Sequence, residues 1–500
     1  MDIKRAKQEI QDAIQAYLVK DAYGEYVIPA IHQRPILLMG PPGIGKTQIM
    51  EQIARECEIG LVAYTITHHT RQSAIGLPFI QTKEFGGKEY SVTEYTMSEI
   101  IASVYEKMES TGLKEGILFI DEINCVSETL APTMLQFLQC KMFGNQKVPE
   151  GWIIVAAGNP PEYNKSVREF DVVTLDRIKK IDVDVNFDVW KEYAYRAGVH
   201  PAVISYLELR KENFYRMENT VDGKMFATAR GWEDLSRLIQ VYERLGKKVD
   251  REVVFQYIQH WKTAKDFANY LELYAKYRKD YGLERILKGQ YGEDTLERLK
   301  FAAFDERLSV VSLLTGKLGE YFRDTYEQDR FVTELFAWLK RYKSGEMLQD
   351  VCEKAKAELE QKQKAGQLAR AEQQRLMRVV DTLEQYDGQV KEEHLSGDSA
   401  FERVKEWFAI EAGKREQMVE STMEALNHAF DFLEDAFGES QEMVVFVTEL
   451  NTNFYSVQFL KENDCGKYFK YNKGLLFDER HQDILDRMDT VEKEAERGLK

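Results

Sequence analysis

The chain has few of the features expected of secreted or membrane-spanning proteins. Its 500 residues include five cysteines, none of them in a CxxC pair, which argues against a disulfide framework or structural zinc. With only 10 prolines and 31 glycines, long disordered linkers are not expected. No apolar run reaches the roughly 18 residues of a membrane helix. The first residues, Met1–Ala6, precede no apolar signal segment, so we expect a cytoplasmic chain without a membrane span.

Positive charge is also scarce, because 68 lysines and arginines face 84 aspartates and glutamates and leave a net charge of −16. A protein that coats nucleic acid needs the opposite balance, so nucleic acid is not the expected partner. A basic channel inside an acidic protein stays open as an alternative. The remaining composition, 44% hydrophobic and 30% charged, is typical of a helix-rich soluble protein. The length predicts two to four domains.

Residues 1–185 alternate short β-branched runs with helical patterns, which predicts a parallel sheet flanked by helices, preceded by an N-terminal helix. The expected strands are Ile36–Met39, Leu61–Ile66, Ile117–Asp121, Trp152–Ala157 and Ile181–Val185. Inserted hairpins are expected at Phe79–Tyr90 and Lys141–Val148, where Gly86-Gly87 and Gly144-Asn145 supply the turns.

Beyond this α/β segment the pattern is helical. We expect a helical segment at 186–285 and an all-α C-terminal region at 286–500, with a helical hairpin or short coiled coil near 345–393. In the first of these the expected helices are Val189–Ala197, Pro201–Lys211, Thr228–Leu245 and Glu252–Leu283.

One octet directly after the first strand fits G-x-x-x-x-G-K-[ST]. It reads Gly40, Pro41, Pro42, Gly43, Ile44, Gly45, Lys46, Thr47, and a helical pattern follows. Glycines let backbone N–H groups curl around a phosphate, and the start of a helix adds a favourable potential. Lys46 is placed to reach the β- and γ-phosphates, and the Thr47 hydroxyl to ligate Mg²⁺. The octet therefore predicts ATP binding.

Two carboxylates, Asp121 and Glu122, end an apolar strand, and Asp121 lies 75 positions after Lys46. A central strand of a parallel sheet delivers such groups to the carboxyl edge, where ligands bind. Asp121 is predicted to hold Mg²⁺ through water, and Glu122 to act as general base toward the attacking water. Asn159 ends a third strand and could orient that water, or it could only cap the turn before Pro160-Pro161.

These motifs together resemble the AAA+ ATPases, and more narrowly the MoxR-like branch of the helix-2-insert clade. The resemblance spans roughly residues 25–285 and rests on the octet, the Asp-Glu strand, the strand ending at Asn159, and three further segments: Thr65–Pro78, Leu175–Ile178 and Phe226–Trp232. It implies a P-loop AAA+ core, with 186–285 as an α-helical lid. The chain departs from the family at Ala229, where a proline is usual, and in a shorter loop at Gln139–Trp152.

The resemblance also implies roles for four residues. Asn159 matches the sensor-1 residue that detects the γ-phosphate, and Arg230 the sensor-2 arginine that lies across the phosphates of its own subunit. Arg177 matches the arginine finger presented to a neighbouring subunit, with Arg168 as the reserve candidate. A planar, permanently charged guanidinium suits that role.

Two of these positions have simpler explanations. Arg177 could form a salt bridge with Asp176 or Asp171, and Arg230 could be an exposed arginine near a helix end.

The resemblance implies a Mg²⁺-dependent ATPase that forms a ring, by family habit a hexamer, and remodels a protein client. It further implies a partner with a von Willebrand factor A domain. An alternative is a nucleic-acid motor or the ATPase of a defence or restriction system, for which Tyr90, Tyr95 and Lys88 near the first insert offer thin support. A signalling switch that hardly turns over would require Glu122 or Arg177 to be absent. The client and the role of 286–500 stay open.

Overall fold

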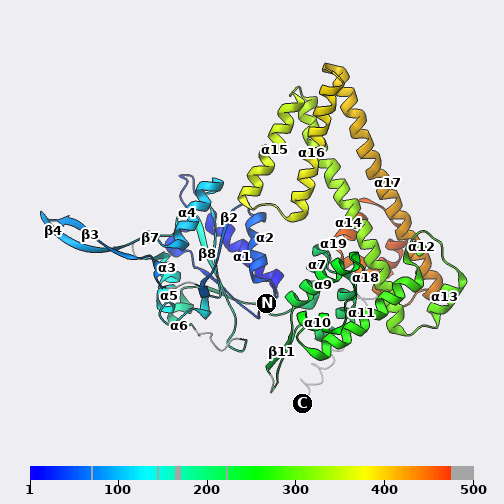
Figure 1. The fold of residues 1–500 in the computed structure, drawn as a ribbon, viewed down its shortest axis with the longest axis horizontal. Helices are drawn as coiled ribbons and strands as arrows, with labels where there is room; N and C mark the ends of the chain where they lie inside the picture. The colour runs from blue at the N-terminus through cyan, green and yellow to red at the C-terminus, as the bar shows by residue number, and fades with distance from the viewer. Residues whose placement is uncertain (69–70, 144–145, 164–169, 221–222, 475–500) are drawn as a thin grey trace, which may run out of the picture. The chain divides into compact units, whose positions relative to one another are not determined.

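The fold is given by a computed structural model that describes residues 1–68, 71–143, 146–163, 170–220 and 223–474 (Figure 1). The chain forms two compact units, and the first contains three separate stretches of sequence. The first unit comprises Met1–Val189, Thr228–Arg230 and Cys352–Val380. The second comprises Trp190–Ala227, Gly231–Val351 and the chain from Asp381 onward.

The first unit is built on a five-stranded sheet in which all neighbouring strands are parallel. Its order is β2 (Gly60–Thr65), β5 (Gly116–Asp121), β8 (Trp152–Gly158), β1 (Ile36–Met39), β9 (Lys179–Asp182). Every residue of β8 is buried, as expected of a strand covered on both faces. The strand order places the ends of β1, β5 and β8 side by side at one edge of the sheet, and the site is built there.

Alternate residues of the strands enter two separate cores. On one face, α1 (Ile3–Leu18) and α2 (Lys46–Glu56) pack on side chains such as Leu38 and Phe119. On the other, α4 (Glu99–Thr111) and α5 (Ala131–Cys140) pack on side chains such as Leu37 and Ile120. Burial on both faces makes the apolar strand runs continuous instead of alternating. The predicted fold, a parallel sheet flanked by helices with a helical remainder, is confirmed.

One predicted strand was misplaced. The structure has β9 at Lys179–Asp182, not at Ile181–Val185, paired with β1 in the register Ile36↔Lys179. Because β9 is the edge strand, two lysines are tolerated there and interrupt the apolar pattern on which the prediction depended. The main chain still continues the pairing one step further, since the Val183 N–H donates to the Met39 carbonyl at 2.7 Å.

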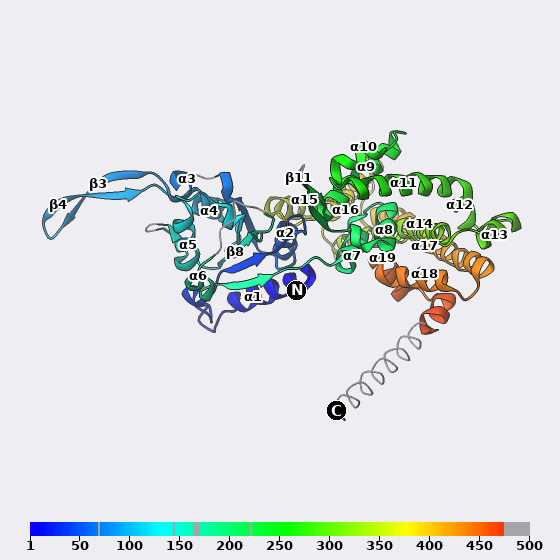
Figure 2. The ribbon, with the colours of Figure 1, turned by 90° about the horizontal axis from the view of Figure 1, so that it is seen from below.

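Two short hairpins interrupt the sheet. The first, β3 (Pro78–Phe85) with β4 (Lys88–Tyr95), follows α3 (Arg71–Ile75) and projects from the sheet as a two-stranded ribbon (Figure 2). The second joins β6 (Met142–Phe143) to β7 (Gln146–Lys147). Both lie where glycine-containing turns predicted them. A short helix, α6 (Val172–Asp176), leads into β9.

The third stretch of the first unit comes from two helices far along the chain, α15 (Leu348–Ala365) and α16 (Arg370–Glu392). Their connecting loop lies against the edge of the sheet domain. Lys107 Nζ donates to the Ala365 carbonyl at 3.2 Å, and Gln367 Nε2 donates to the Glu58 carbonyl at 3.3 Å. A helical hairpin therefore occupies the region near 345–393.

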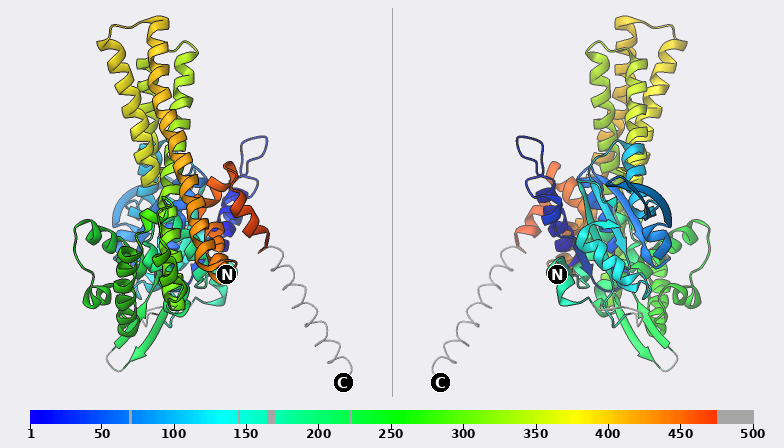
Figure 3. Two further views of the ribbon diagram at one scale, coloured as in Figure 1. Left: turned by 90° about the vertical axis from the view of Figure 1, so that its right-hand side faces the viewer. Right: turned by 90° about the vertical axis from the view of Figure 1, so that its left-hand side faces the viewer.

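The second unit is almost entirely helical. Its helices are α7 (Phe187–Ala197), α8 (Pro201–Leu209), α9 (Ala229–Arg244), α10 (Arg251–Tyr257), α11 (Trp261–Tyr281), α12 (Leu283–Ile286), α13 (Glu293–Lys300), α14 (Phe304–Lys343), α17 (Gly397–Phe437), α18 (Gln441–Thr452) and α19 (Phe454–Glu462). The two longest, α14 and α17, run side by side (Figure 3). The hydroxyls of Thr325 and Thr422 bond across their seam at 2.8 Å. Among the helices described, none is long and apolar enough to span a bilayer.

Two details of this unit were not predicted. The helix expected at Glu252–Leu283 is two helices, α10 and α11, with a break between Tyr257 and Trp261. His260 caps the start of α11, since its Nδ1 accepts from the Thr263 N–H at 3.2 Å. Neither glycine nor proline marks this break. The chain also forms an antiparallel pair, β10 (Arg216–Thr220) and β11 (Gly223–Ala227), which was missed because β10 is mostly polar and β11 is short.

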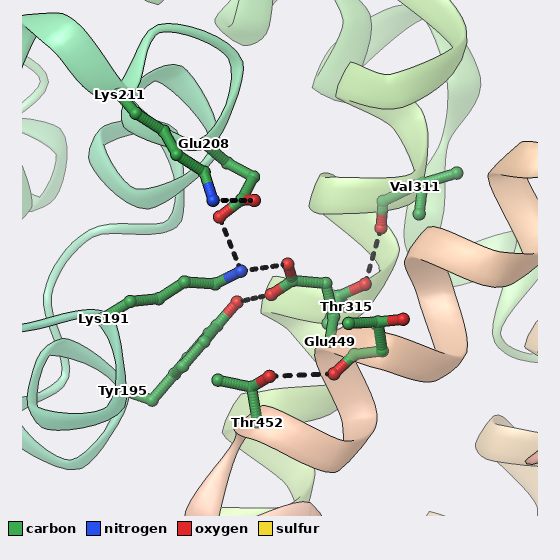
Figure 4. Close-up of polar contacts among 9 residues, drawn as sticks. Lys191, Tyr195, Glu208, Lys211, Val311, Thr315, Glu449 and Thr452 are labelled. Atoms are coloured by element: carbon green, nitrogen blue, oxygen red, sulfur yellow. Dashed lines mark hydrogen bonds and ion pairs between the residues drawn. The ribbon is translucent and has the colours of Figure 1, made fainter. Parts of the chain in front are cut away.

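A buried ionic cluster joins α7 and α8 to α18 (Figure 4). Lys191 Nζ lies 2.5 Å from Glu449 Oε1 and 2.7 Å from Glu208 Oε2, and the Tyr195 hydroxyl donates to the other oxygen of Glu449. Burial alone would lower the pKa of Lys191, but the two carboxylates outweigh it and the pKa is raised. The cluster therefore fastens residues of the 186–285 segment to the C-terminal helices within one unit.

Candidate nucleotide-binding site

The loop from Gly40 to Gly45 has the conformation that its glycines predict. Gly43 and Gly45 have φ of +76° and +94°, in the left-handed region that other residues rarely adopt. A Cβ on Gly40 would lie 2.8 Å from the Val183 carbonyl oxygen, so the close approach of the segment after β9 also requires glycine. The loop ends at Lys46, the first residue of α2.

Lys46 is buried, with 7% of its surface exposed, and among the described residues its Nζ donates only to neutral acceptors. These are the carbonyls of Gly40 and Pro41, both at 2.8 Å, and Asn159 Oδ1 at 2.9 Å. Burial lowers the pKa of Lys46 to about 8, opposed by the more distant carboxylates of Asp121 and Glu122. An ammonium held by neutral groups in a glycine-lined loop is poised for an anionic ligand, as a phosphate-binding site requires.

Thr47 and Asp121 meet across two elements. The Thr47 hydroxyl, on α2, donates to Asp121 Oδ2 at 2.9 Å at the end of β5. The other carboxylate oxygen of Asp121 accepts from the Glu122 N–H at 2.9 Å. A hydroxyl and a carboxylate in contact are hard oxygen ligands of the type that Mg²⁺ prefers, directly or through water. The residues predicted for the metal lie together.

Glu122 has a φ of +57°, uncommon for a residue other than glycine. Its Oε2 accepts from the Thr67 hydroxyl at 3.1 Å. Thr67 lies just after β2, next to β5 in the sheet, and sequence reasoning gave it no role. This contact fixes one oxygen of the carboxylate.

Asn159 follows β8 and is held by a second asparagine that the sequence analysis also missed. Asn124 is buried; its Nδ2 donates to the Asn159 carbonyl at 2.8 Å, and its Oδ1 accepts from the Asn159 N–H at 3.3 Å. A Cβ on Gly158 would lie 2.6 Å from Asn124 Oδ1, so glycine is needed to admit this clamp. The clamp directs the side chain of Asn159 toward Lys46. Asn159 therefore does more than cap a turn.

Arg230 lies beside the phosphate-binding loop at the start of α9. Its backbone N–H donates to the Gly43 carbonyl at 3.2 Å, and its Cβ is 3.5 Å from where a Cβ on Gly43 would be. Arg230 is exposed, as the simpler explanation expected. The positive charge of Arg230 contributes to the lowered pKa of Lys46, which places both cations at the same site.

Arg177 occupies a different position. It is exposed at the end of α6, and its NH1 donates to Gln139 Oε1 on α5 at 2.7 Å. Within the described ranges it forms no ion pair with Asp176 or Asp171, although its charge helps to lower the pKa of Asp171 after the hydrogen bonds from Thr174. It also has no hydrogen bond to any of the residues around Lys46. The reserve candidate, Arg168, lies outside the described residues.

Residues 36–176 match the model of a family described as "ATPase family associated with various cellular activities (AAA)". This stretch holds the phosphate loop, the Asp-Glu pair and Asn159 in the geometry above. Residues 36–176 form an AAA-family domain. They include four of the five parallel strands of the sheet, β2, β5, β8 and β1, and the fifth, β9, follows directly after them.

Among solved structures, the chain is similar to a proline-to-glycine mutant of RuvB from Thermotoga maritima. The identity is 15%, the match covers 51% of this chain and 69% of that chain, and the TM-score is 0.30. At this TM-score the match supports no argument about function. No curated protein matches the chain.

Proposed function

We propose that the chain is a Mg²⁺-dependent ATPase of the MoxR type, which assembles into a ring and remodels a protein partner. The observation that supports ATPase activity is the pair of hydrogen bonds, Lys46 to Asn159 and Thr47 to Asp121, at the carboxyl edge of the AAA domain. Each of these side chains has a distinct task in phosphoryl transfer, and none is explained by stability alone.

The roles follow from position. Lys46 would exchange its neutral acceptors for the β- and γ-phosphate oxygens, while the loop N–H groups cradle the β-phosphate. Glu122, steadied by Thr67, would accept a proton from the attacking water. Asn159 would orient that water or the γ-phosphate, held rigid by Asn124. Precise positioning matters here because the enzyme contributes mainly orientation and electrostatic stabilisation.

Mg²⁺ would be held by Thr47 and Asp121 and would supply charge neutralisation between the phosphates. The hydrogen bond between the two side chains keeps both oxygens at the place where they would hold the cation. Arg230, adjacent to Gly43, would lie over the phosphates of its own chain as the sensor-2 arginine.

The position of Arg177 supports the proposal that the chain assembles into a ring. It is exposed and bonded to a neutral glutamine, so its charge is available to a neighbouring chain. Exposed Val172 and Val173, five and four residues before it, are consistent with a contact surface around it. We assign Arg177 as the arginine finger of the next subunit, with Arg168 in reserve.

Mixing two inactive variants tests whether each ATP site is completed by Arg177 of the neighbouring subunit. Arg177→Ala chains keep an intact Glu122, and Glu122→Gln chains keep an intact Arg177. In a mixed ring, interfaces that combine the two intact residues hold a complete site, so part of the ATPase activity should return. An arginine finger contributes about 10³-fold or more to the rate in related hydrolases, so partial rescue would exceed the background.

The matched control mixes Glu122→Gln with the double variant Glu122→Gln/Arg177→Ala. These chains co-assemble equally well but contain no complete site, and the mixture should stay inactive. Rescue in the control, or none in the test despite shown co-assembly, would remove Arg177 from the trans role.

The proposed partner is a protein carrying a von Willebrand factor A domain, as the MoxR resemblance implies. One observation favours the alternative of a nucleic-acid motor or defence ATPase: the β3–β4 ribbon exposes Phe79, Phe85, Tyr90 and Tyr95. Exposed aromatics can stack on bases, but they equally suit a protein client. Measuring ATPase stimulation by single-stranded DNA and by a co-encoded von Willebrand factor A protein separates the two; only stimulation by the protein agrees with the proposal.

A further inference from the structure

The second unit contains a large open cavity far along the sequence from the phosphate-binding loop. Its volume is about 840 Å³, and it lies among the ends of α7, α9 and α11 and the middle of α14. Small-molecule sites typically have about 300–1,000 Å³. The cavity is therefore large enough for a metabolite.

The charge of this cavity is opposite to that of the protein. Its lining includes five lysines and arginines and only two glutamates: Arg244, Lys247, Arg278, Lys317, Arg323, and Glu243, Glu320. These residues leave three positive charges around the cavity, in a chain whose net charge is −16. A concave basic surface in an acidic protein focuses a positive potential and attracts anions.

Several of these cations lack strong internal partners. In the described part of the chain, Arg244 forms no ion pair or hydrogen bond, and Lys247 lies only over the ring of Tyr242, 5.6 Å from its centroid. Arg278 reaches Glu243 at a long 3.4 Å. In a strong charge-assisted hydrogen bond the nitrogen and oxygen are about 2.7–2.9 Å apart, so the contact between Arg278 and Glu243 is weak. These guanidinium and ammonium groups can therefore bind an incoming anion without first breaking a strong pair.

The hydroxyl of Tyr274 provides a second, independent observation. Tyr274 is 4% exposed and lines the cavity, and its hydroxyl has no hydrogen-bond partner among the described residues. The hydroxyl itself is not fully enclosed by protein atoms, so it can donate to a ligand in the cavity without giving up an internal hydrogen bond. Burial raises the pKa of Tyr274 well above its usual value, so the phenol stays protonated and can donate.

The wall behind Tyr274 is ordered. The ring of His200 packs edge-on against it at 6.1 Å, His200 Nδ1 accepts from the Ala202 N–H, and its Nε2 lies 3.4 Å from Glu243. The side chain of Arg323, on α14, reaches Gly198 after the end of α7. A Cβ on Gly198 would lie 3.3 Å from Arg323 NH1. A rigid hydroxyl and cations on three different helices satisfy the requirement that a binding site be held by its scaffold.

We propose that this cavity binds a small phosphorylated metabolite with at least two negative charges. Arg278 and Arg323 pair with its phosphate oxygens, Arg244 and Lys247 add charge at the mouth, and the Tyr274 hydroxyl donates to it. Every lining residue belongs to the second unit, so this ligand is separate from the ATP expected in the AAA domain. The proposal does not depend on the proposed ATPase function.

The experiment is calorimetric titration of inorganic tripolyphosphate into the full chain carrying Lys46→Ala, which disables the phosphate-binding loop. We expect one site per chain with a micromolar Kd. Adding Arg278→Ala and Arg323→Ala should weaken binding at least about a hundredfold, because two charge-assisted contacts are lost. Adding Tyr274→Phe instead should weaken it by about tenfold, since one hydrogen bond to a charged group is removed.

Arg237→Ala is the matched control, because Arg237 is on α9 like Arg244 but pairs with Glu233 and Asp234 away from the cavity. It should leave Kd unchanged. Binding only at millimolar tripolyphosphate, or equal weakening by Arg237→Ala, would overturn the proposal. So would displacement of tripolyphosphate by a single-stranded oligonucleotide at lower concentration, which would mark a nucleic-acid surface. If the double arginine variant fails to fold, the milder Tyr274→Phe variant still decides.

Discussion

Lys46 should make nucleotide affinity fall as pH rises through the pKa of its buried ammonium. In the free protein Nζ is held by two carbonyls and an amide oxygen, and burial lowers its pKa to about 8. Phosphate oxygens stabilise the charged form, so nucleotide binding raises this pKa. At pH 7 the lysine is already protonated and binding costs nothing extra. At pH 9 it is mostly neutral and must first take up a proton.

The size of the effect follows from the lowered pKa. The affinity scales with the fraction of Lys46 that is protonated in the free protein, provided the pKa in the complex lies above the range studied. With a pKa of about 8, this fraction falls about tenfold between pH 7 and pH 9, equal to about 1.4 kcal/mol. The terminal phosphate of ATP ionises with a pKa of about 6, so it does not titrate in this window.

The assay measures the Kd of a fluorescent ATP analogue from pH 7 to 9 at constant ionic strength. The chain carries Glu122→Gln so that the nucleotide persists. Lys46→Arg should remove the slope, because a guanidinium stays charged throughout. Lys141 is the control: burial lowers its pKa to about 8 as well, but its Nζ donates to the Ala30 carbonyl, and Lys141→Gln should keep the slope. A flat profile for the starting protein, or a slope lost with Lys141→Gln, would refute the reasoning.

Three further outcomes are expected. Asn124→Ala should lower kcat by about tenfold or more with little change in ATP affinity, because Asn159 loses its clamp; an unchanged kcat would contradict this. Gly40→Ala should abolish nucleotide binding, since its Cβ meets a backbone oxygen at 2.8 Å, and normal binding in a filter assay would show that the loop adapts. Lys191→Met should cost about 3 kcal/mol of unfolding free energy in urea by leaving Glu449 buried without its cation, and a loss below about 0.5 kcal/mol would show the pair to be dispensable.

The core of the site could be predicted from the sequence because its parts are local. The phosphate loop needs only a strand, a glycine-rich turn and a helix in succession, and all three lie within Ile36–Glu56. Asp121 and Glu122 end a fully apolar run, and such a run fixes both a buried strand and the edge at which it stops. Periodicity likewise separated the α/β segment from the helical remainder, since strands and helices have different repeats.

The sequence predictions were wrong where the place of a segment in the tertiary structure, and not its local apolar pattern, decides which residues it contains. The strand β9 carries lysines because it is an edge, and its edge position depends on the strand order of the whole sheet. The helix break before Trp261 needs no glycine or proline, since the side chain of His260 supplies the cap. Neither the order nor the cap is visible in an apolar pattern.

The sequence by itself determined that this protein has a phosphate-binding loop, an Asp-Glu pair and a helical second half. Only the tertiary structure decided which polar residues position these catalytic groups, and which charged residues meet in the helical unit. Thr67 and Asn124 reach the site because β2, β5 and β8 are neighbours, and Lys191 meets a carboxylate 258 positions away. Such pairs are set by strand order and helix packing, since a hydrogen bond depends on distance in space and leaves no periodicity in the chain.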